Sequence, residues 1–293
     1  PSSILLRRVM DLSDIVLRHI IVGLGGGSNG TVRETGFDLS PASEAMAILA
    51  LASDLGDLRK RLGKIIVAMD RKGGLITAED VQCAGAMAVL LKDAIKPNLI
   101  QTVENTPCIV HAGPFGNIAH GNSSIIADKI AVKLADYVVT ESGFGADMGA
   151  EKFFNIKCRY SGLKPDAGVL VCTVRALKAH SGRFKIVPGR PLAPELLEEN
   201  LSAIEEGGAN LVKQIENVQA FGIPVVVAIN KMTEDTEAEI KAIKRIALEA
   251  GAETAAVSNV FAQGGEGGVE LAEAIVSVAQ KKSTFKPLYS LKS

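Results

Sequence analysis

A polar, glycine-rich stretch interrupts the apolar pattern in the middle of this chain. Residues 111–129, HAGPFGNIAHGNSSIIADK, begin with two histidines, two asparagines, three glycines and a proline in quick succession. A core segment would not tolerate so many polar groups without partners, and a plain surface loop rarely needs two imidazoles. Glycine also lets the backbone approach a ligand closely. The spacing therefore predicts an active-site loop that includes His111, Asn117 and His120.

Other polar residues lie where apolar runs end. Runs rich in Val, Ile and Leu are predicted as strands buried on both faces, and ligands of open α/β sheets bind outside the carboxyl ends of such strands. His111, Glu141, Arg175 and Asn230 each lie at or just after such an end. The predicted strands are 64–69, 107–111, 136–141, 168–174, 224–230 and 254–258.

The elements that must position these residues follow from the periodicity. Strands alternate with helical patterns, which predicts an α/β fold with a mostly parallel sheet and flanking helices. A long helical stretch is weakened by Gly207 and Gly208, and a boundary predicted there divides the chain into domains 1–208 and 209–293. Capping residues predict helix starts at Ser40 with Pro41, Thr77 with Asp80, Asn122 or Ser123, and Thr236 with Glu239.

Three further motifs have competing interpretations. The stretch IIVGLGGGSNG at 20–30 looks like a dinucleotide-binding turn, but no helix is predicted directly after it, so a glycine-rich loop is favoured. The stretch AINKM at 228–232 has Thr233 where a guanine-reading motif needs Asp, which disfavours a GTPase relative. Asn230 in it is either a site residue or a turn cap. The stretch GGEGGVELAEAI at 264–275 either offers backbone N–H groups to an anion or forms a flexible turn.

The composition excludes several classes of protein. The 293 residues are 47% hydrophobic and 22% charged, which is typical of a soluble globular protein, and the net charge of −1 gives no overall field that favours nucleic acid or membrane surfaces. Aromatic residues make up 4% and Trp is absent, which disfavours base stacking. No apolar run approaches the roughly 20 residues of a transmembrane helix. Four cysteines without a CxxC pair favour free thiols in a reducing cytosol and no metal site.

Long motifs resemble a known family, formate–tetrahydrofolate ligase, also called 10-formyltetrahydrofolate synthetase. The resemblance runs from about Arg7 to Tyr289. It implies an ATP-dependent ligase of one-carbon metabolism, in which ATP phosphorylates formate to formyl phosphate and N10 of tetrahydrofolate attacks the formyl carbon. The motifs are MAVLLKDAIKPNLIQTVENTP, HAGPFGNIAHGNSSIIADKIAVKLADYVVTESGFGADMGAEKFFNIKCRYSGLKPDA and VCTVRALKAHSG.

The resemblance also implies the surroundings of this chemistry. The expected small molecules are ATP, Mg²⁺, formate and tetrahydrofolate, with no nucleic acid or membrane partner. The expected fold is related to P-loop nucleoside triphosphate hydrolases, with a smaller second α/β domain at 209–293 that contributes the folate pocket. A cytoplasmic homotetramer is expected.

Site residues carry over from the family position by position. Arg175 and Lys178 are expected to face phosphates, although either stem could instead pack against a helix. Met232 and Phe261 match two aromatic side chains that sandwich the pterin, and Val257 matches an aliphatic position of the pocket. The expected catalytic residues are His111, Asn117, His120 and Arg175, and the expected cofactor-binding residues are Phe144, Asp147, Lys178, Asn230, Met232, Val257 and Phe261.

The sequence also departs from the family. It has no G-x-x-x-x-G-K-[ST] loop and no initiator Met, so the chain is expected to be a middle fragment that is inactive and poorly stable alone. Met232 cannot stack as a ring, and Phe261 offers less area than the usual Trp, so weaker folate binding is expected. These departures keep a second hypothesis open, a truncated non-catalytic paralogue that serves as a folate-binding or assembly module.

Overall fold

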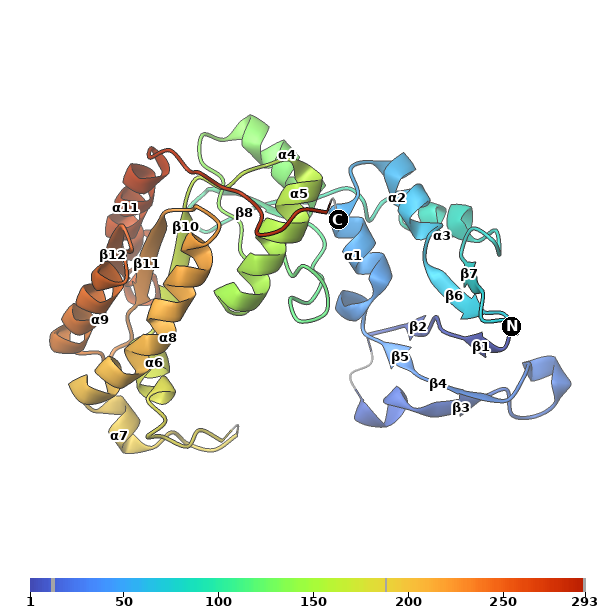
Figure 1. Ribbon diagram of the computed structural model, residues 1–293, viewed down its shortest axis with the longest axis horizontal. Helices are drawn as coiled ribbons and strands as arrows, with labels where there is room; N and C mark the ends of the chain where they lie inside the picture. The colour runs from blue at the N-terminus through green and yellow to red at the C-terminus, as the bar shows by residue number, and fades with distance from the viewer. Residues whose placement is uncertain (12–13, 188, 292–293) are drawn as a thin grey trace. The chain divides into compact units, whose positions relative to one another are not determined.

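The computed structural model describes residues 1–11, 14–187 and 189–291 and divides into two compact units, Pro1–Phe144 and Gly145–Ser293, here unit 1 and unit 2 (Figure 1). The boundary predicted at residue 208 falls instead inside helix α8, Leu201–Gln219, which runs unbroken across Gly207 and Gly208. The two glycines belong to the middle of a packed helix.

Unit 1 consists of short strands in small sheets, with helices between them. Its strands are β1 Ser3–Ile4, β2 Arg8–Val9, β3 Ile20–Val22, β4 Arg33–Thr35, β5 Phe37–Asp38, β6 Ile66–Met69, β7 Leu75–Thr77, β8 Asn98–Gln101 and β9 Pro107–Val110. Its helices are α1 Glu44–Leu51, α2 Leu55–Leu62, α3 Ala84–Leu90 and α4 Ile125–Leu134, with 3₁₀ turns η1 Ile15–Arg18, η2 Gly27–Asn29 and η3 Ser40–Ala42.

Pairing in unit 1 is mostly antiparallel, which corrects the prediction of a mostly parallel sheet for this part of the chain. Strands β1, β6 and β7 form one antiparallel sheet, β3 pairs with β4 and β8 with β9 in the same sense, and only β2 and β5 run parallel among the described residues. Short connections explain the pairs β3–β4, β6–β7 and β8–β9, because a parallel pair needs a long crossover whereas an antiparallel pair can be joined by a turn.

The predicted strands of unit 1 have mixed outcomes. The predictions at 64–69 and 107–111 are confirmed by β6 and β9. The prediction at 136–141 is wrong, because these residues form no strand and Val139 is 83% exposed. A β-branched run becomes a strand only where a neighbouring strand accepts its backbone hydrogen bonds.

Helix starts in unit 1 lie a few residues later than predicted. Ser43, not Ser40, caps α1 by accepting the Met46 N–H at 3.1 Å, because Ser40 and Pro41 belong to the 3₁₀ turn η3. Ser124 caps α4 in place of Asn122 or Ser123. Thr77 and Asp80 do hydrogen-bond to each other, with Thr77 Oγ1 donating at 2.7 Å, but they close a turn, and the next helix, α3, begins only at Ala84.

The glycine-rich stretch at 20–30 is a hairpin loop. Strand β3 enters it, the turn η2 crosses it and β4 returns antiparallel, so no helix follows the glycines, as expected for a stretch that is not a dinucleotide fingerprint. Gly23 has φ +87°, and a Cβ there would lie 2.6 Å from the Thr31 carbonyl oxygen. The loop therefore depends on glycine for its own close backbone approach.

Unit 2 is a parallel sheet with helices, and it confirms the α/β prediction. Three of the apolar runs form parallel strands as predicted, and these strands lie in the order β10–β11–β12. The strands are β10 Gly168–Cys172, β11 Val225–Asn230 and β12 Thr254–Ser258. The helices are α5 Cys158–Ser161, α6 Val174–His180, α7 Pro194–Leu197, α8, α9 Glu237–Glu249, α10 Val260–Gln263 and α11 Val269–Ala279, with π turns η4 Ala146–Ala150 and η5 Phe153–Lys157 and the 3₁₀ turn η6 Gly264–Gly268.

The core of unit 2 surrounds the central strand. Residues 225–229 of β11 are buried, and helices α8, α9 and α11 pack against the sheet (Figure 1). Helices α6 and α8 approach so closely that a Cβ at Gly207 would lie 1.8 Å from the Leu177 carbonyl oxygen. Glycine at this position is therefore a packing requirement.

Strand β10 is an edge of this sheet, with one apolar face uncovered. Val171 is 65% exposed and Val169 is 39% exposed, whereas Leu170 between them packs against the core. The alternation follows from the two-residue period of a strand.

Candidate active site

The carboxyl ends of the three parallel strands gather several predicted residues at one edge of the sheet in unit 2. Arg175 lies in the first turn of α6, after β10 ends. Asn230 ends β11 in register with Ser258 at the end of β12, and the Lys231 N–H donates to the Ser258 carbonyl at 3.0 Å. Met232 and Phe261 therefore follow two neighbouring strand ends. The parallel pairing agrees with the sequence prediction, but His111 and Glu141, which were predicted at the same edge as Arg175 and Asn230, belong to unit 1.

The side chains at this edge differ in exposure. Met232 is half-buried, whereas Phe261, in the short helix α10, is 91% exposed. Val257 is half-buried on β12 and packs against the core. The exposed ring of Phe261 is an apolar surface that a flat ligand can cover.

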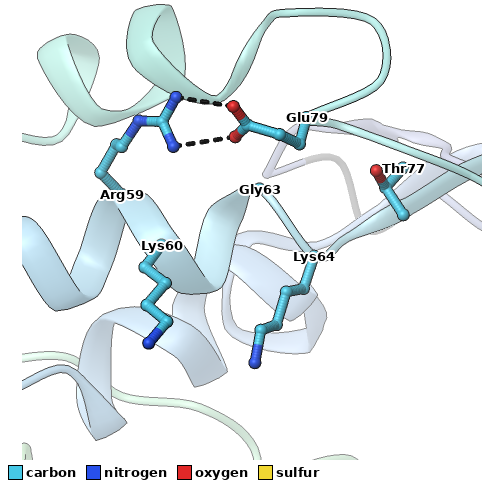
Figure 2. Close-up of a pocket in the computed structure, with 6 residues that line it drawn as sticks. All are labelled: Arg59, Lys60, Gly63, Lys64, Thr77 and Glu79. Atoms are coloured by element: carbon cyan, nitrogen blue, oxygen red, sulfur yellow. Dashed lines mark hydrogen bonds and ion pairs between the residues drawn. The ribbon is translucent and has the colours of Figure 1, made fainter.

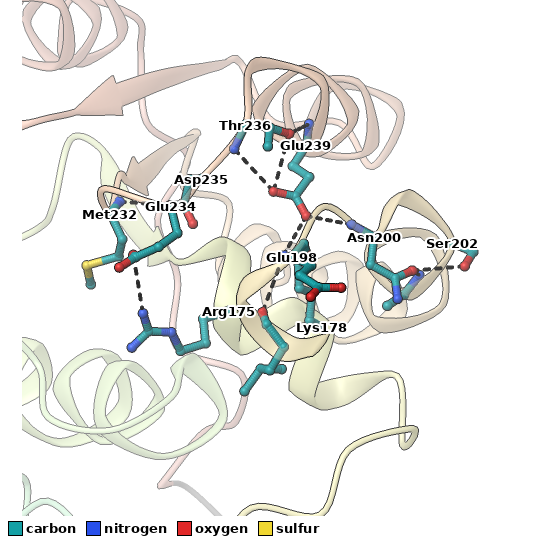
Figure 3. Close-up of polar contacts among 12 residues, drawn as sticks. Arg175, Lys178, Glu198, Asn200, Ser202, Met232, Glu234, Asp235, Thr236 and Glu239 are labelled. Atoms are coloured by element: carbon teal, nitrogen blue, oxygen red, sulfur yellow. Dashed lines mark hydrogen bonds and ion pairs between the residues drawn. The ribbon is translucent and has the colours of Figure 1, made fainter. Parts of the chain in front are cut away.

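A short loop, residues 231–235, joins β11 to α9 and is closed on itself by one carboxylate (Figure 3). The Met232 N–H donates to Asp235 Oδ2 at 2.8 Å, and the Asp235 N–H donates to the Met232 carbonyl at 3.2 Å. Glu234 lies 3.6 Å from the Arg175 guanidinium on α6. Burial raises the pKa of Asp235, although the Met232 N–H opposes this shift. The loop is thus tied both to itself and to the neighbouring strand–helix corner.

Lys178 lies inside the fold in a buried ion pair (Figure 3). Its Nζ is 2.6 Å from Glu239 Oε1, and the two side chains are 2% and 0% exposed. The same ammonium donates to the Glu198 carbonyl at 2.7 Å and to the Leu196 carbonyl at 3.4 Å. Its donors are therefore directed at protein acceptors, and the alternative in which the Lys178 stem packs against helices agrees with this placement.

Glu239 is held from both sides. Its carboxylate accepts the Asn200 N–H at 2.9 Å and the Thr236 N–H at 3.2 Å, which completes the capping box predicted for α9. Burial acts to raise the pKa of Glu239, but the Lys178 ammonium and the two backbone donors outweigh it and lower the pKa. The carboxylate therefore stays ionised in the interior.

In unit 1, His111 is buried with both ring nitrogens engaged. Nε2 lies 2.7 Å from the Ala94 carbonyl, and Nδ1 lies 2.6 Å from Ser124 Oγ. A neutral imidazole protonated at Nε2 satisfies both contacts, because Ser124 Oγ can then donate to Nδ1 while it accepts the Ala127 N–H at 2.9 Å. His111 thereby anchors the start of α4.

The rest of the predicted loop folds back on itself and on residues 140–144. Gly121 has φ +55°, and a Cβ there would lie 2.2 Å from the Gly116 Cα. The Gly143 N–H donates to the Gly121 carbonyl at 3.1 Å. Of the predicted residues, His120 is buried at 2% exposure, Asn117 is exposed, and Phe144 is 69% exposed with φ +65°.

Asn122 was predicted both as one of the polar residues of this loop and as a possible helix cap. It is 4% exposed, and its Nδ2 donates to Ser142 Oγ at 3.1 Å and to the Glu141 carbonyl. The signal in the sequence was its position among the other polar residues of the loop. Its observed role is to join two segments of the loop region.

Asp147 and the second glycine motif have local partners in unit 2. The Asp147 N–H and Oδ1 contact the amide of Gln214 on α8 at 3.2 and 3.3 Å. Gly267 lies where a Cβ would be 2.4 Å from the Asn259 carbonyl oxygen, so the glycines at 264–268 form a tight packed turn before α11.

The predicted residues therefore fall into two groups, one in each unit. His111, Asn117, His120 and Phe144 belong to unit 1, and the others belong to unit 2. The described residues contain no group of three or more His, Cys, Asp or Glu side chains arranged for a metal ion. Within the same residues, no helix is long and apolar enough to cross a membrane.

A cavity of about 360 Å³ lies in unit 1 away from these residues (Figure 2). Arg59 and Glu79 form a two-pronged pair across it, with both N–O distances 2.8 Å. Lys60 and Lys64 extend away from that pair, and both are exposed. The Arg59 charge is already matched by Glu79, so the cavity is a shallow basic surface.

Comparison with known proteins shows one family. A family model described as formate–tetrahydrofolate ligase matches residues 1–293. A formate–tetrahydrofolate ligase of Saccharopolyspora erythraea is 57% identical over 289 residues, which is 99% of this chain and 51% of that protein. One from Desulforamulus reducens is 56% identical with the same coverage, and formate–tetrahydrofolate ligase 2 of Rubrobacter xylanophilus is 61% identical over 275 residues, 94% of this chain and 48% of that protein. The chain spans about half the length of the curated relatives it matches.

Proposed function

The chain belongs to the formate–tetrahydrofolate ligase family, and on that premise we propose that its full-length gene product ligates formate to tetrahydrofolate with ATP, giving 10-formyltetrahydrofolate. The observation that carries the proposal is the family match over the whole chain at more than half identity to curated ligases. The proposal includes a formyl phosphate intermediate and a cytoplasmic homo-oligomer.

Within this reaction, the sheet edge of unit 2 supplies the pterin site. Met232 and Phe261 follow neighbouring strand ends, and the pterin ring lies between them in the proposal. Phe261 contributes an exposed aromatic face, and Met232 contributes a polarizable apolar side chain. Val257 and Asn230 line the same edge.

The remaining predicted residues take different parts in the proposal. Arg175 is half-exposed at the start of α6 and carries the positive charge that would face a phosphate, with Glu234 as its partner in the absence of one. Lys178 supports the edge of the sheet from the interior, through its ion pair with Glu239 at the start of α9. His111 orients the loop that carries Asn117 and His120, since both of its ring nitrogens bind within unit 1.

ATP and Mg²⁺ belong to the family reaction, but this chain offers little to hold them. The sequence has no G-x-x-x-x-G-K-[ST] loop, and the described residues show no cluster of metal-ligating side chains. Mg²⁺ is usually held by one or two carboxylates together with substrate phosphates, and we assign no step to the metal.

A second candidate function is a non-catalytic folate-binding or assembly module. Met232, which replaces a stacking ring in the pterin slot, favours it together with the missing phosphate loop. The ligase and the folate-binding form of the second candidate both require folate to bind at the edge of the sheet in unit 2, whereas an assembly module does not.

The reaction itself tests the proposal. The full-length gene product is expected to form 10-formyltetrahydrofolate from formate, ATP and tetrahydrofolate, as followed by absorbance after acid conversion, with formate omitted as the control. Residues 1–293 alone are expected to form none, because they lack the phosphate-binding loop. Tetrahydrofolate binding without turnover by the full-length product would favour the second candidate.

Pterin affinity is expected to respond to the two flanking residues. In the full-length gene product, Met232→Phe should tighten tetrahydrofolate binding by a few-fold up to about tenfold, because a two-sided aromatic sandwich gains roughly 0.5–1.5 kcal/mol. Phe261→Ala should weaken binding by more, since it removes the one aromatic face. Titration of the three proteins with tetrahydrofolate measures this, and ATP affinity is the control. A neutral Met232→Phe together with a silent Phe261→Ala would remove both residues from the pterin site.

A further inference from the structure

The loop that carries Met232 depends on a carboxylate that the family resemblance did not single out. We propose that Asp235 is a positioning residue for the pterin site, and that its side chain fixes Met232 at the sheet edge by holding the Met232 amide. The inference rests on the proposed function. It assigns Asp235 no contact with the reacting atoms.

The geometry is a reciprocal clamp across three residues. Asp235 Oδ2 accepts the Met232 N–H at 2.8 Å, while the Met232 carbonyl accepts the Asp235 N–H at 3.2 Å. A loop closed by two such bonds has little freedom in the intervening dihedral angles. The Met232 backbone is therefore held in place by the residue three positions later.

The clamp is fixed at both of its ends. On one side the Lys231 N–H donates to the Ser258 carbonyl at 3.0 Å, which ties the start of the loop to β12. On the other side Thr236 begins the capping box of α9, whose Glu239 is bound to the buried Lys178. Asp235 thus holds the loop between two anchored ends.

The surroundings of Asp235 disfavour the ionised carboxylate. A role of Asp235 in positioning the loop is therefore distinct from a role in stabilising the fold. Burial raises the pKa of Asp235, and the neighbouring Glu239 carboxylate adds to this effect, while Met232, Lys178 and Arg175 oppose it. A group whose pKa is higher in the folded than in the unfolded state lowers stability as the pH rises through that interval. The ionised Asp235 therefore costs some stability at neutral pH and contributes order to the loop.

Two substitutions distinguish these contributions. Asp235→Asn keeps an oxygen that can accept the Met232 N–H and removes the charge, whereas Asp235→Ala removes the acceptor. In the full-length gene product, Asp235→Ala should raise the KM and Kd for tetrahydrofolate about tenfold with kcat nearly unchanged, because one hydrogen bond to a charged group is lost. Asp235→Asn should stay within about twofold of wild type. Neither change should lower the thermal midpoint beyond that of the control.

Thr233→Ala is the matched control, since Thr233 lies exposed in the same loop. Hydrogen–deuterium exchange of the peptide spanning 228–236 measures, in the ligand-free protein, how strongly the clamp protects the amides of this loop. The exchange rate of this peptide should increase in Asp235→Ala and should stay at the wild-type value in Asp235→Asn and Thr233→Ala.

The outcomes separate the inference from the function. A wild-type protein that binds no tetrahydrofolate would overturn the proposed function. If the wild type binds and Asp235→Ala behaves like Thr233→Ala in both affinity and exchange, only the role of Asp235 is overturned. Equal loss of binding in Asp235→Asn and Asp235→Ala would also overturn it, because the charge and not the clamp would then matter.

Discussion

Removing either partner of the buried Lys178–Glu239 pair is expected to lower the free energy of unfolding by about 3–5 kcal/mol. Lys178→Met leaves the Glu239 carboxylate in the interior without its cation, and Glu239→Gln leaves the Lys178 ammonium there without its anion. The two side chains are 2% and 0% exposed, so water cannot replace the lost partner without opening the helices around them. Urea unfolding of the chain, followed by far-ultraviolet circular dichroism, measures the change.

The double variant separates the cost of an unpaired charge from the value of the pair. Lys178→Met with Glu239→Gln removes both charges, and Gln at this position can still complete the capping box with Thr236. It should therefore be more stable than either single variant. Glu237→Ala is the control, because it removes an ion pair at the surface. Glu237 lies 2.9 Å from Lys231 and is 85% exposed, so little change in stability is expected. A double variant as unstable as the sum of the singles would show that the charges themselves are not the cause.

Acidification should reduce the stabilisation that the ionised Glu239 carboxylate contributes. Because the folded-state pKa of Glu239 is lowered from 4.5, its stabilisation is complete above that value and is lost as the pH falls through the lowered pKa. The difference in stability between wild type and Glu239→Gln should therefore shrink on acidification and stay constant between about pH 6 and 8.

Gly207→Ala is expected to destabilise unit 2 by about 1–3 kcal/mol or more, although alanine is the better helix former. The added Cβ would lie 1.8 Å from the Leu177 carbonyl oxygen, and backbone on both sides of this contact cannot rotate away. Helices α6 and α8 would have to separate. Because α6 carries Arg175 and Lys178, the sheet edge should be disturbed as well.

The adjacent glycine is the matched control for this prediction. A Cβ at Gly208 would meet the Ile246 side chain at 2.9 Å, and Ile246 can adjust its rotamer. Gly208→Ala gains about 1 kcal/mol of helix propensity, so its net effect should be far smaller than that of Gly207→Ala. Thermal unfolding of the two variants decides this. Equal midpoints would mean that the α6–α8 contact is looser than the backbone indicates.

Local patterns in the sequence predicted local structure well. The capping box of Thr236 and Glu239 is present at the start of α9, because both members lie within one turn and act on each other. The three strands of unit 2 followed from continuous apolar runs, but the predicted burial on both faces holds for β11 and not for β10, whose Val171 is 65% exposed. In contrast, residues 136–141 have the composition of a strand but pair with none among the described residues.

The roles of single residues in the site were less accessible to sequence reasoning. The sequence marked Gly207 as a weakness in a helix, since the backbone it contacts belongs to a distant segment. Lys178 was expected to face phosphates, and no local signal announced Glu239 as its buried partner. The sequence did not single out Asp235, because its role depends on a hydrogen bond from the backbone N–H of Met232. Residue types alone do not indicate such a bond.

The uncovered face of β10 has a consequence for handling the protein. An edge strand with outward valines is a template on which a further strand, from the same molecule or another, can add without any rearrangement of the existing sheet. Parallel growth on this side would extend the row of strand carboxyl ends beyond β10. Addition of a strand at this edge would require a partner for the backbone donors and acceptors of β10 that point away from β11.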